Sequence, residues 1–328
     1  MNLTAFNTVK HKELCYNACI YQQFLVNNML SETNEIIHRA WRHGIVVPGF
    51  NIPHLPMMKP VVDALRDTGA FGLIMVARLE WMKFKAGSLA DIRGEYDRVK
   101  DPRHTRLHLD HVPVIDEDGC VVDYASVIKE ALALGYDSVM LDGSRLPLAE
   151  NIRRTREVVE AAHARGVPVE AELGAVMGHE KGPLPDYEEL FASGKGFTDP
   201  EEARGFAAAT AVDWLSVAIG NVHGAISDAV RSRKKVEARL NIEHLRKLRQ
   251  LAPVPFVLHG GSGIPKSYVM EAVRAGVAKI NIATAIRQPY EAEAGNSIRA
   301  AQAAVYKAVA DIIRDDLELE GSADMLIA

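Results

Sequence analysis

The sequence predicts an α/β protein built as a (β/α)₈ barrel (a TIM barrel), with an N-terminal helical extension and a C-terminal helix. Short apolar runs with β-branched residues alternate with helical segments, and each run ends in polar residues. Eight such units fit within about 250 residues, the usual size of a closed barrel. The predicted strands are residues 45–52, 71–77, 105–111, 138–144, 168–174, 214–220, 255–261 and 278–284. An open doubly wound sheet is the alternative, because periodicity does not show closure.

The segments between these strands carry helix signals. Apolar residues recur at three- and four-residue spacing, most clearly in 149–165 and 200–211. The second segment opens with Thr198, Asp199 and Pro200, which provide capping side chains and a proline at the first turn. A further helical pattern runs from 284 to about 316 and is broken near Gly295. We predict one barrel domain over residues 41–328, preceded by a helical extension over residues 1–40.

Composition limits the class of partner. The 328-residue chain has a net charge of −5 and is 48% hydrophobic, without the concentrated basic patch that nucleic-acid binding requires. No stretch approaches the roughly 20 apolar residues of a membrane span, and the start lacks a signal-peptide pattern. The 3 cysteines leave one unpaired, which fits a reducing compartment. We therefore expect a cytoplasmic protein that binds neither nucleic acid nor membrane.

Histidines follow three of the predicted strands. His111, His223 and His259 stand at the ends of strands three, six and seven. In a parallel barrel these ends meet at one mouth, where active sites lie. Three imidazoles with an open fourth position are typical of catalytic zinc, although a single histidine is more often a packing residue. The pattern favours a metal site at this mouth. We expect His108, which lies two residues before Asp110 on strand three, to face the helices or the opposite side of the pleat.

A phosphate site is predicted next to these histidines. Gly260, Gly261 and Ser262 follow strand seven and offer backbone N–H groups, while residues 281–284 close strand eight. Barrels frequently bind phosphate with the loops after these two strands. A glycine-rich loop by itself is usually a turn, so the prediction depends on the pairing of both loops.

Seven motifs occur in a characteristic order, and they are LHLDH, DSVMLDGSRLPLAEN, VEAELG, GFTDPEEA, VDWLSVAIGNVHG, VLHGGSGIP and AKINIAT. In them the chain resembles the class II (zinc-dependent) fructose-bisphosphate and tagatose-bisphosphate aldolase family, as a divergent member closest to the tagatose type. The resemblance covers about residues 42–290. It implies a lyase that reversibly cleaves a phosphorylated ketose, a bisphosphate in the family, into dihydroxyacetone phosphate and an aldehyde. It also implies a homodimer or homotetramer.

The resemblance assigns roles to individual residues. His111, His223 and His259 would ligate one Zn²⁺, and a monovalent cation is a further implied cofactor. Asp110 would be the acid/base at the hydroxyl on the carbon released as aldehyde, and Glu180 would move the proton on the dihydroxyacetone phosphate carbon. Two further acids, Glu172 and Asp142, would lie beside the metal or at an alternative metal position. The implied substrate- and phosphate-binding residues are Asn51, Gly224, Gly260, Gly261, Ser262, Asn281, Ala283 and Thr284.

Four departures from the family pattern bear on the substrate. The lysine usual shortly after Gly224 is missing, strand two runs into Arg78 instead of a small-residue turn, the stretch 112–124 is longer, and Lys181 follows Glu180. We expect the longer loop to extend over the mouth. One hypothesis is that the aldehyde is not glyceraldehyde 3-phosphate and that Arg78 or Arg145 binds a different anionic group. The alternative is a standard enzyme with tolerated loop changes.

Two other function classes remain as alternatives. One is a metal-dependent isomerase or epimerase, which product analysis distinguishes because cleavage yields two fragments. The other is a non-catalytic barrel used as an assembly subunit. The presence of both Asp110 and Glu180 counts against the second.

Overall fold

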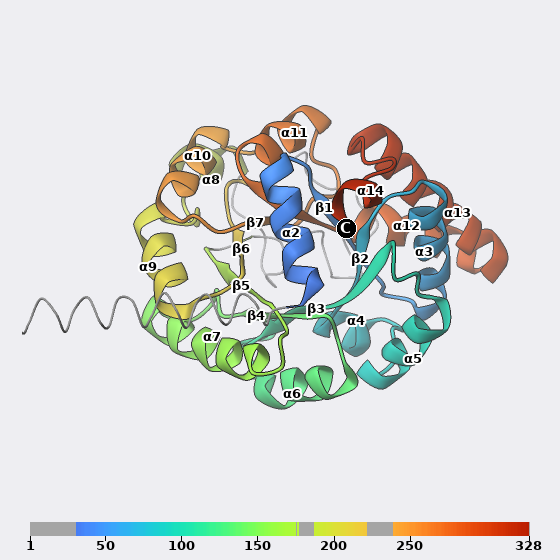
Figure 1. The fold of residues 1–328 in the computed structure, drawn as a ribbon, viewed down its shortest axis with the longest axis horizontal. Coiled ribbons are helices and arrows are strands. Elements are labelled where there is room, and N and C mark those ends of the chain that lie inside the picture. Colours follow the sequence, from blue (N-terminus) through green and yellow to red (C-terminus); the bar gives the residue numbers. More distant parts are fainter. Residues whose placement is uncertain (1–30, 175, 177–186, 222–238, 328) are drawn as a thin grey trace, which may run out of the picture.

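The computed structural model of the chain describes residues 31–174, 176, 187–221 and 239–327. Within them, eight parallel strands pair in chain order, and β8 pairs with β1 to close the barrel (Figure 1). The predicted (β/α)₈ barrel is confirmed, and the open-sheet alternative is wrong. The strands are β1 (Val47–Asn51), β2 (Gly72–Ala77), β3 (Thr105–Pro113), β4 (Ser138–Asp142), β5 (Val169–Leu173), β6 (Trp214–Val217), β7 (Phe256–Leu258) and β8 (Val277–Ile282).

Helices surround the barrel and bury the outer faces of its strands (Figure 1). They are α3 (Met58–Asp67), α4 (Arg78–Lys83), α5 (Leu89–Val99), α6 (Tyr124–Leu134), α7 (Leu148–His163), α8 (Tyr187–Ser193), α9 (Pro200–Thr210), α10 (Ile242–Leu251) and α11 (Lys266–Arg274). The two clearest sequence predictions correspond to α7 and α9. As predicted, the Asp199 carboxylate caps α9 by accepting from the backbone N–H groups of Glu201 and Glu202.

The C-terminal part of the chain forms a helical tail. It comprises α12 (Thr284–Ala294), α13 (Ile298–Asp311), a π-helical turn (Ile312–Asp316) and α14 (Ala323–Leu326). The predicted break falls at Gly295, which ends α12. Within the described part of the chain, no helix combines enough length and apolar character to cross a lipid bilayer.

A helix closes the amino-terminal end of the barrel. This helix, α2 (Glu32–His43), spans the predicted boundary between residues 40 and 41 and crosses the barrel opening in Figure 1. Its side chains Ile36 and Ile37 are fully buried in a cluster with the inward-facing residues near the strand starts. The indole Nε1 of Trp214 donates to Asn34 Oδ1 at 2.9 Å. Because α2 covers this end, the polar side chains near the carboxyl ends of the strands face the opposite mouth of the barrel.

We expect this seal to contribute substantially to stability. Ile37→Ala removes a fully buried side chain and should lower the free energy of unfolding by about 2–5 kcal/mol. The matched control is Ile298→Ala at the start of α13, where the side chain is 49% exposed and the change should stay within about 0.5 kcal/mol. Urea unfolding followed by circular dichroism measures both. Equal losses for the two variants would contradict the role of α2.

Candidate active site

The strand ends opposite α2 bring together most of the predicted site residues that the structure describes. They come from six strands or the residues just after them, and they are Asn51, Asp110, His111, Asp142, Glu172, His259 and Asn281. Three predicted site residues, Glu180, His223 and Gly224, lie outside the described residues.

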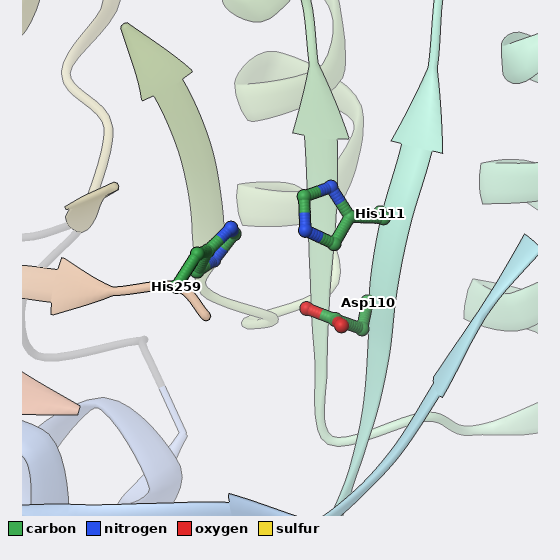
Figure 2. Close-up of side chains that lie close together, drawn as sticks. All are labelled: Asp110, His111 and His259. Atoms are coloured by element: carbon green, nitrogen blue, oxygen red, sulfur yellow. The ribbon is translucent and has the colours of Figure 1, made fainter. Parts of the chain in front are cut away.

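A bulge in β3 lets two consecutive residues face the same mouth. In a regular strand, Asp110 and His111 would point to opposite faces. Here the register between β3 and β4 shifts between Leu109 and Val112, and His111 has a left-handed φ of 34°. Figure 2 shows the Asp110 carboxylate and the His111 ring both directed toward His259. A non-glycine residue in this conformation costs about 1–3 kcal/mol, which marks the position as functionally constrained.

The Asp110 carboxylate is held from both sides. Asn51 Nδ2 donates to Oδ2 at 2.9 Å and Asn281 Nδ2 donates to Oδ1 at 3.0 Å. Burial by itself would raise the pKa of Asp110, but His111, the nearby His108 ring and the Lys279 ammonium hold it well below its usual range. The side chain is therefore an oriented anion that can accept a proton.

The His111 imidazole lies among acidic groups. Its Nδ1 is 3.4 Å from Asp142 Oδ2 and 4.0 Å from Glu172 Oε2. Burial by itself would lower the pKa of His111, but Asp110, Asp142 and Glu172 raise it to about 10. For Glu172, burial and the like charge of Asp142 raise the pKa. This local field favours a positive charge at the position that His111 faces.

The contacts of His259 determine which of its ring nitrogens carries a proton. Its Nε2 is 2.8 Å from Glu170 Oε1, and its Nδ1 is 3.1 Å from Glu172 Oε2. Burial by itself would raise the pKa of Glu170, but the Lys279 ammonium and His259 lower it to about 2. An ionised carboxylate only accepts hydrogen bonds, so Nε2 donates to Glu170 and Nδ1 is the nitrogen left to face a metal ion. Nδ1 and Glu172 Oε2 thus lie next to each other as possible ligand atoms for a cation.

This donor set fits a divalent metal ion. Ligand atoms of Asp110, His111 and His259 lie within 4.8 Å of one another, and the two imidazole rings have a centroid separation of 4.4 Å. Neutral imidazole nitrogen and carboxylate oxygen are donors that zinc and other first-row transition metals accept. His111 and His259 could hold such an ion, with Glu172 and Asp142 beside it.

Three of the predicted phosphate-binding residues line a cavity of about 600 Å³, whose other lining residues are largely apolar and come mainly from α11, β8 and the C-terminal tail. Gly261, Ser262 and Thr284 are among its lining residues, while Ala283 directly precedes α12. The Gly261 N–H donates to the carbonyl of Asn281 at 3.0 Å, and this hydrogen bond connects the loop after β7 with the end of β8. A Cβ at Gly261 would come within 2.5 Å of Ile280 Cγ1, which explains the glycine there. Gly260 adopts a positive φ of 66°.

The two arginines proposed to bind a substrate anion both contact Asp116. Arg78 Nη1 is 3.5 Å from Asp116 Oδ2, and Arg145 Nη1 donates to the Asp116 carbonyl at 2.7 Å. Asp116 belongs to the long loop after β3, which folds back as a hairpin with Ile115 paired to Val121. The arginines thereby attach this loop to α4 and to the β4–α7 connection.

One prediction about β3 is wrong. His108 does not face the helices but lies fully buried inside the barrel, with Nε2 3.7 Å from Asp110 Oδ1. Residues two apart on a strand share a face, so the expectation contradicted the strand period. The same period also identifies two further inward-facing charged residues, Glu170 and Lys279, which lie two positions before Glu172 and Asn281 on the inner face of the barrel.

The geometry predicts which histidines hold metal. His111→Ala and His259→Ala should each reduce bound zinc from about one equivalent to little after dialysis, because each removes a nitrogen ligand. His43→Ala, at an exposed position on α2, is the control and should keep the wild-type metal content. Elemental analysis of the purified proteins provides the measurement. Undiminished metal in both site variants would contradict the assignment.

Comparisons with known proteins identify the family. Residues 31–325 match the family model described as fructose-bisphosphate aldolase class-II. The crystal structure of the YdjI aldolase from Escherichia coli K12 is 26% identical with a TM-score of 0.69, covering 90% of this chain and 99% of that one. A fructose-bisphosphate aldolase from Campylobacter jejuni shares the fold, at 20% identity and a TM-score of 0.66, over 88% and 95% of the two chains. The protein is therefore an aldolase-type enzyme and belongs to the class-II fructose-bisphosphate aldolase family.

Proposed function

We propose that the protein is a zinc-dependent aldolase that reversibly cleaves a phosphorylated ketose, a ketose bisphosphate by family resemblance, into dihydroxyacetone phosphate and an aldehyde. The observation that carries this proposal is the Asp110 carboxylate, oriented by two asparagines beside the imidazoles of His111 and His259. A base and a metal-binding pair at one mouth are the two elements that metal-assisted aldol cleavage requires.

His111 and His259, with His223 as the predicted third ligand, would hold a zinc ion, which would supply Lewis-acid chemistry for the ketose carbonyl. Asp110 takes the proton of the hydroxyl on the carbon that leaves as aldehyde. The bond from this carbon to its neighbour on the carbonyl side then breaks. Its electron pair stays with the dihydroxyacetone phosphate carbon, and the hydroxyl oxygen forms the aldehyde C=O.

Two further features of the site bear on the two ends of the substrate. The cavity beside Gly261, Ser262 and Thr284 accommodates the phosphate of the dihydroxyacetone half. On the aldehyde side, Glu80 caps α4 by accepting from the Ala77 N–H at 2.7 Å, in place of the small-residue turn usual in the family. The proton that the dihydroxyacetone carbon receives is assigned to Glu180 by resemblance. We infer from these aldehyde-side differences that the aldehyde is not glyceraldehyde 3-phosphate.

A cleavage assay tests the function. Zinc-loaded protein is offered a panel of ketose mono- and bisphosphates, and dihydroxyacetone phosphate is measured with a coupled NADH-consuming dehydrogenase. We expect release from at least one ketose, loss of release after chelation, and recovery on adding zinc. A single isomerised product would establish the isomerase alternative. Cleavage of fructose or tagatose 1,6-bisphosphate at rates ordinary for the family would contradict the inference about the aldehyde.

Asp110→Asn tests the assigned base. The variant should bind zinc like the wild type but lose about 10²–10⁴-fold in kcat, because the amide cannot accept the hydroxyl proton. Asp324→Asn is the control, since that side chain is 76% exposed on α14, and it should leave kcat unchanged. Steady-state rates with metal content measured on the same samples distinguish lost chemistry from lost metal. Full activity of Asp110→Asn would contradict the assignment of Asp110 as the base.

A further inference from the structure

Inside the barrel, one lysine contacts two residues that lead to different parts of the site, the proposed metal ligand His259 and the proposed base Asp110. Lys279 on β8 has no exposed surface, which is rare for lysine unless its charge is compensated. Its Nζ lies 2.8 Å from Glu170 Oε2 and donates to Asn281 Oδ1 at 2.7 Å. Sequence separation hides this arrangement, because β5 and β8 are brought face to face only by closure of the barrel.

The contact of Lys279 with Glu170 leads to the proposed metal ligand His259. With one carboxylate oxygen on Lys279, Glu170 presents the other to His259 Nε2 at 2.8 Å. A lysine ammonium only donates, so Glu170 faces it as a carboxylate, and the same carboxylate accepts from Nε2 of a neutral His259. Nδ1 of that tautomer carries the lone pair, on the side of His111 and Glu172. Without the ammonium, the fully buried Glu170 carboxylate would lose the cation 2.8 Å from its Oε2.

The contact of Lys279 with Asn281 leads to the proposed base Asp110. An amide group can present either its oxygen or its nitrogen to a neighbour. Lys279 only donates, so it requires the Asn281 carbonyl oxygen on its own side and turns the amide nitrogen toward Asp110. Asn281 therefore donates to Asp110 Oδ1 and leaves that carboxylate as a hydrogen-bond acceptor in a set orientation.

We propose that Lys279 is a positioning residue that sets the His259 tautomer through Glu170 and the orientation of Asp110 through Asn281. The inference rests on the proposed function, because it takes His259 as a metal ligand and Asp110 as the base. It differs from a covalent role: Lys279 is engaged by Glu170 and Asn281 and does not attack the ketose carbonyl as a Schiff-base lysine would.

Three variants separate positioning from simple structural support. Lys279→Met removes the ammonium but keeps much of the side-chain volume, and Glu170→Gln removes the opposite charge. The double variant Glu170→Gln/Lys279→Met leaves no uncompensated charge, so it should recover much of the thermal stability that Lys279→Met loses. Lys307→Met, which is 77% exposed on α13, is the matched control.

The readouts are zinc affinity by chelator competition, thermal unfolding, and kcat and KM on the substrate found. We expect Lys279→Met to weaken zinc binding about 10- to 100-fold and to lower kcat more than it changes KM. The double variant should regain thermal stability but recover neither zinc affinity nor kcat. Recovery of all three would show a purely structural pair and overturn the proposal, as would wild-type zinc affinity and kcat in Lys279→Met.

Two further measurements keep this inference separable from the aldolase assignment. ¹⁵N NMR of imidazole-labelled protein reads the His259 tautomer without metal or substrate, and we expect the Nε2–H form in the wild type and its loss in Lys279→Met. A wild-type protein with this tautomer but without cleavage would refute the proposed function alone. Borohydride trapping with substrate should leave Lys279 unlabelled, and a reduced adduct there would refute the positioning role.

Discussion

Ionisable side chains lie buried in the barrel interior beneath the mouth, and the site depends on how the charges of Glu170, Lys279 and Asp110 are compensated. Glu170, Lys279, His108 and His259 have no exposed surface, and Asp110 is 1% exposed. An isolated charge at such depth is strongly unfavourable, and removing one partner of a buried pair costs about 3–5 kcal/mol. Each charged group there is consequently positioned by its neighbours. In the proposed arrangement, Lys279 orients His259 through Glu170 and Asp110 through Asn281.

The site also depends on the irregular backbone of β3. Strand alternation would direct either Asp110 or His111 into the mouth, but not both. The register shift opposite β4 and the left-handed backbone of His111 resolve this conflict. The surrounding barrel holds the unfavourable conformation in place, because both flanking segments remain paired in the sheet. A proton acceptor and a metal-binding imidazole thereby become neighbours on one strand.

The acidic character of the mouth connects these local features with metal chemistry. Asp110, Asp142 and Glu172 approach the ring of His111 closely enough to raise its pKa to about 10 against the effect of burial. The same negative field stabilises a divalent cation that neutral imidazoles can ligate. By contrast, the cationic groups Arg78 and Arg145 serve to attach the loop after β3. Carboxylates thus surround His111, while these two arginines lie at the supporting loop.

Strand and helix positions could be predicted from local patterns. Apolar runs of strand length, the capping residues before α9 and the break at Gly295 all reflect short-range chemistry. The convergence of Asp110, His111 and His259 also followed from the sequence, because parallel strands in a barrel end at one mouth. The direction of His108 was predicted wrongly, since the strand period was not applied consistently along β3. Applying it to β5 and β8 would have singled out Glu170 and Lys279 as inward-facing.

The sequence by itself thus determined the fold class, the family resemblance and the residue types gathered at the strand ends. Only the tertiary structure decided which partners those residues have. The contacts of Lys279 with Glu170, of Asn281 and Asn51 with Asp110, and of the arginines with Asp116 join separate strands or loops. Such contacts depend on barrel closure and on the register between strands. Local sequence carries no record of either, because register is set by the packing of all eight strands together.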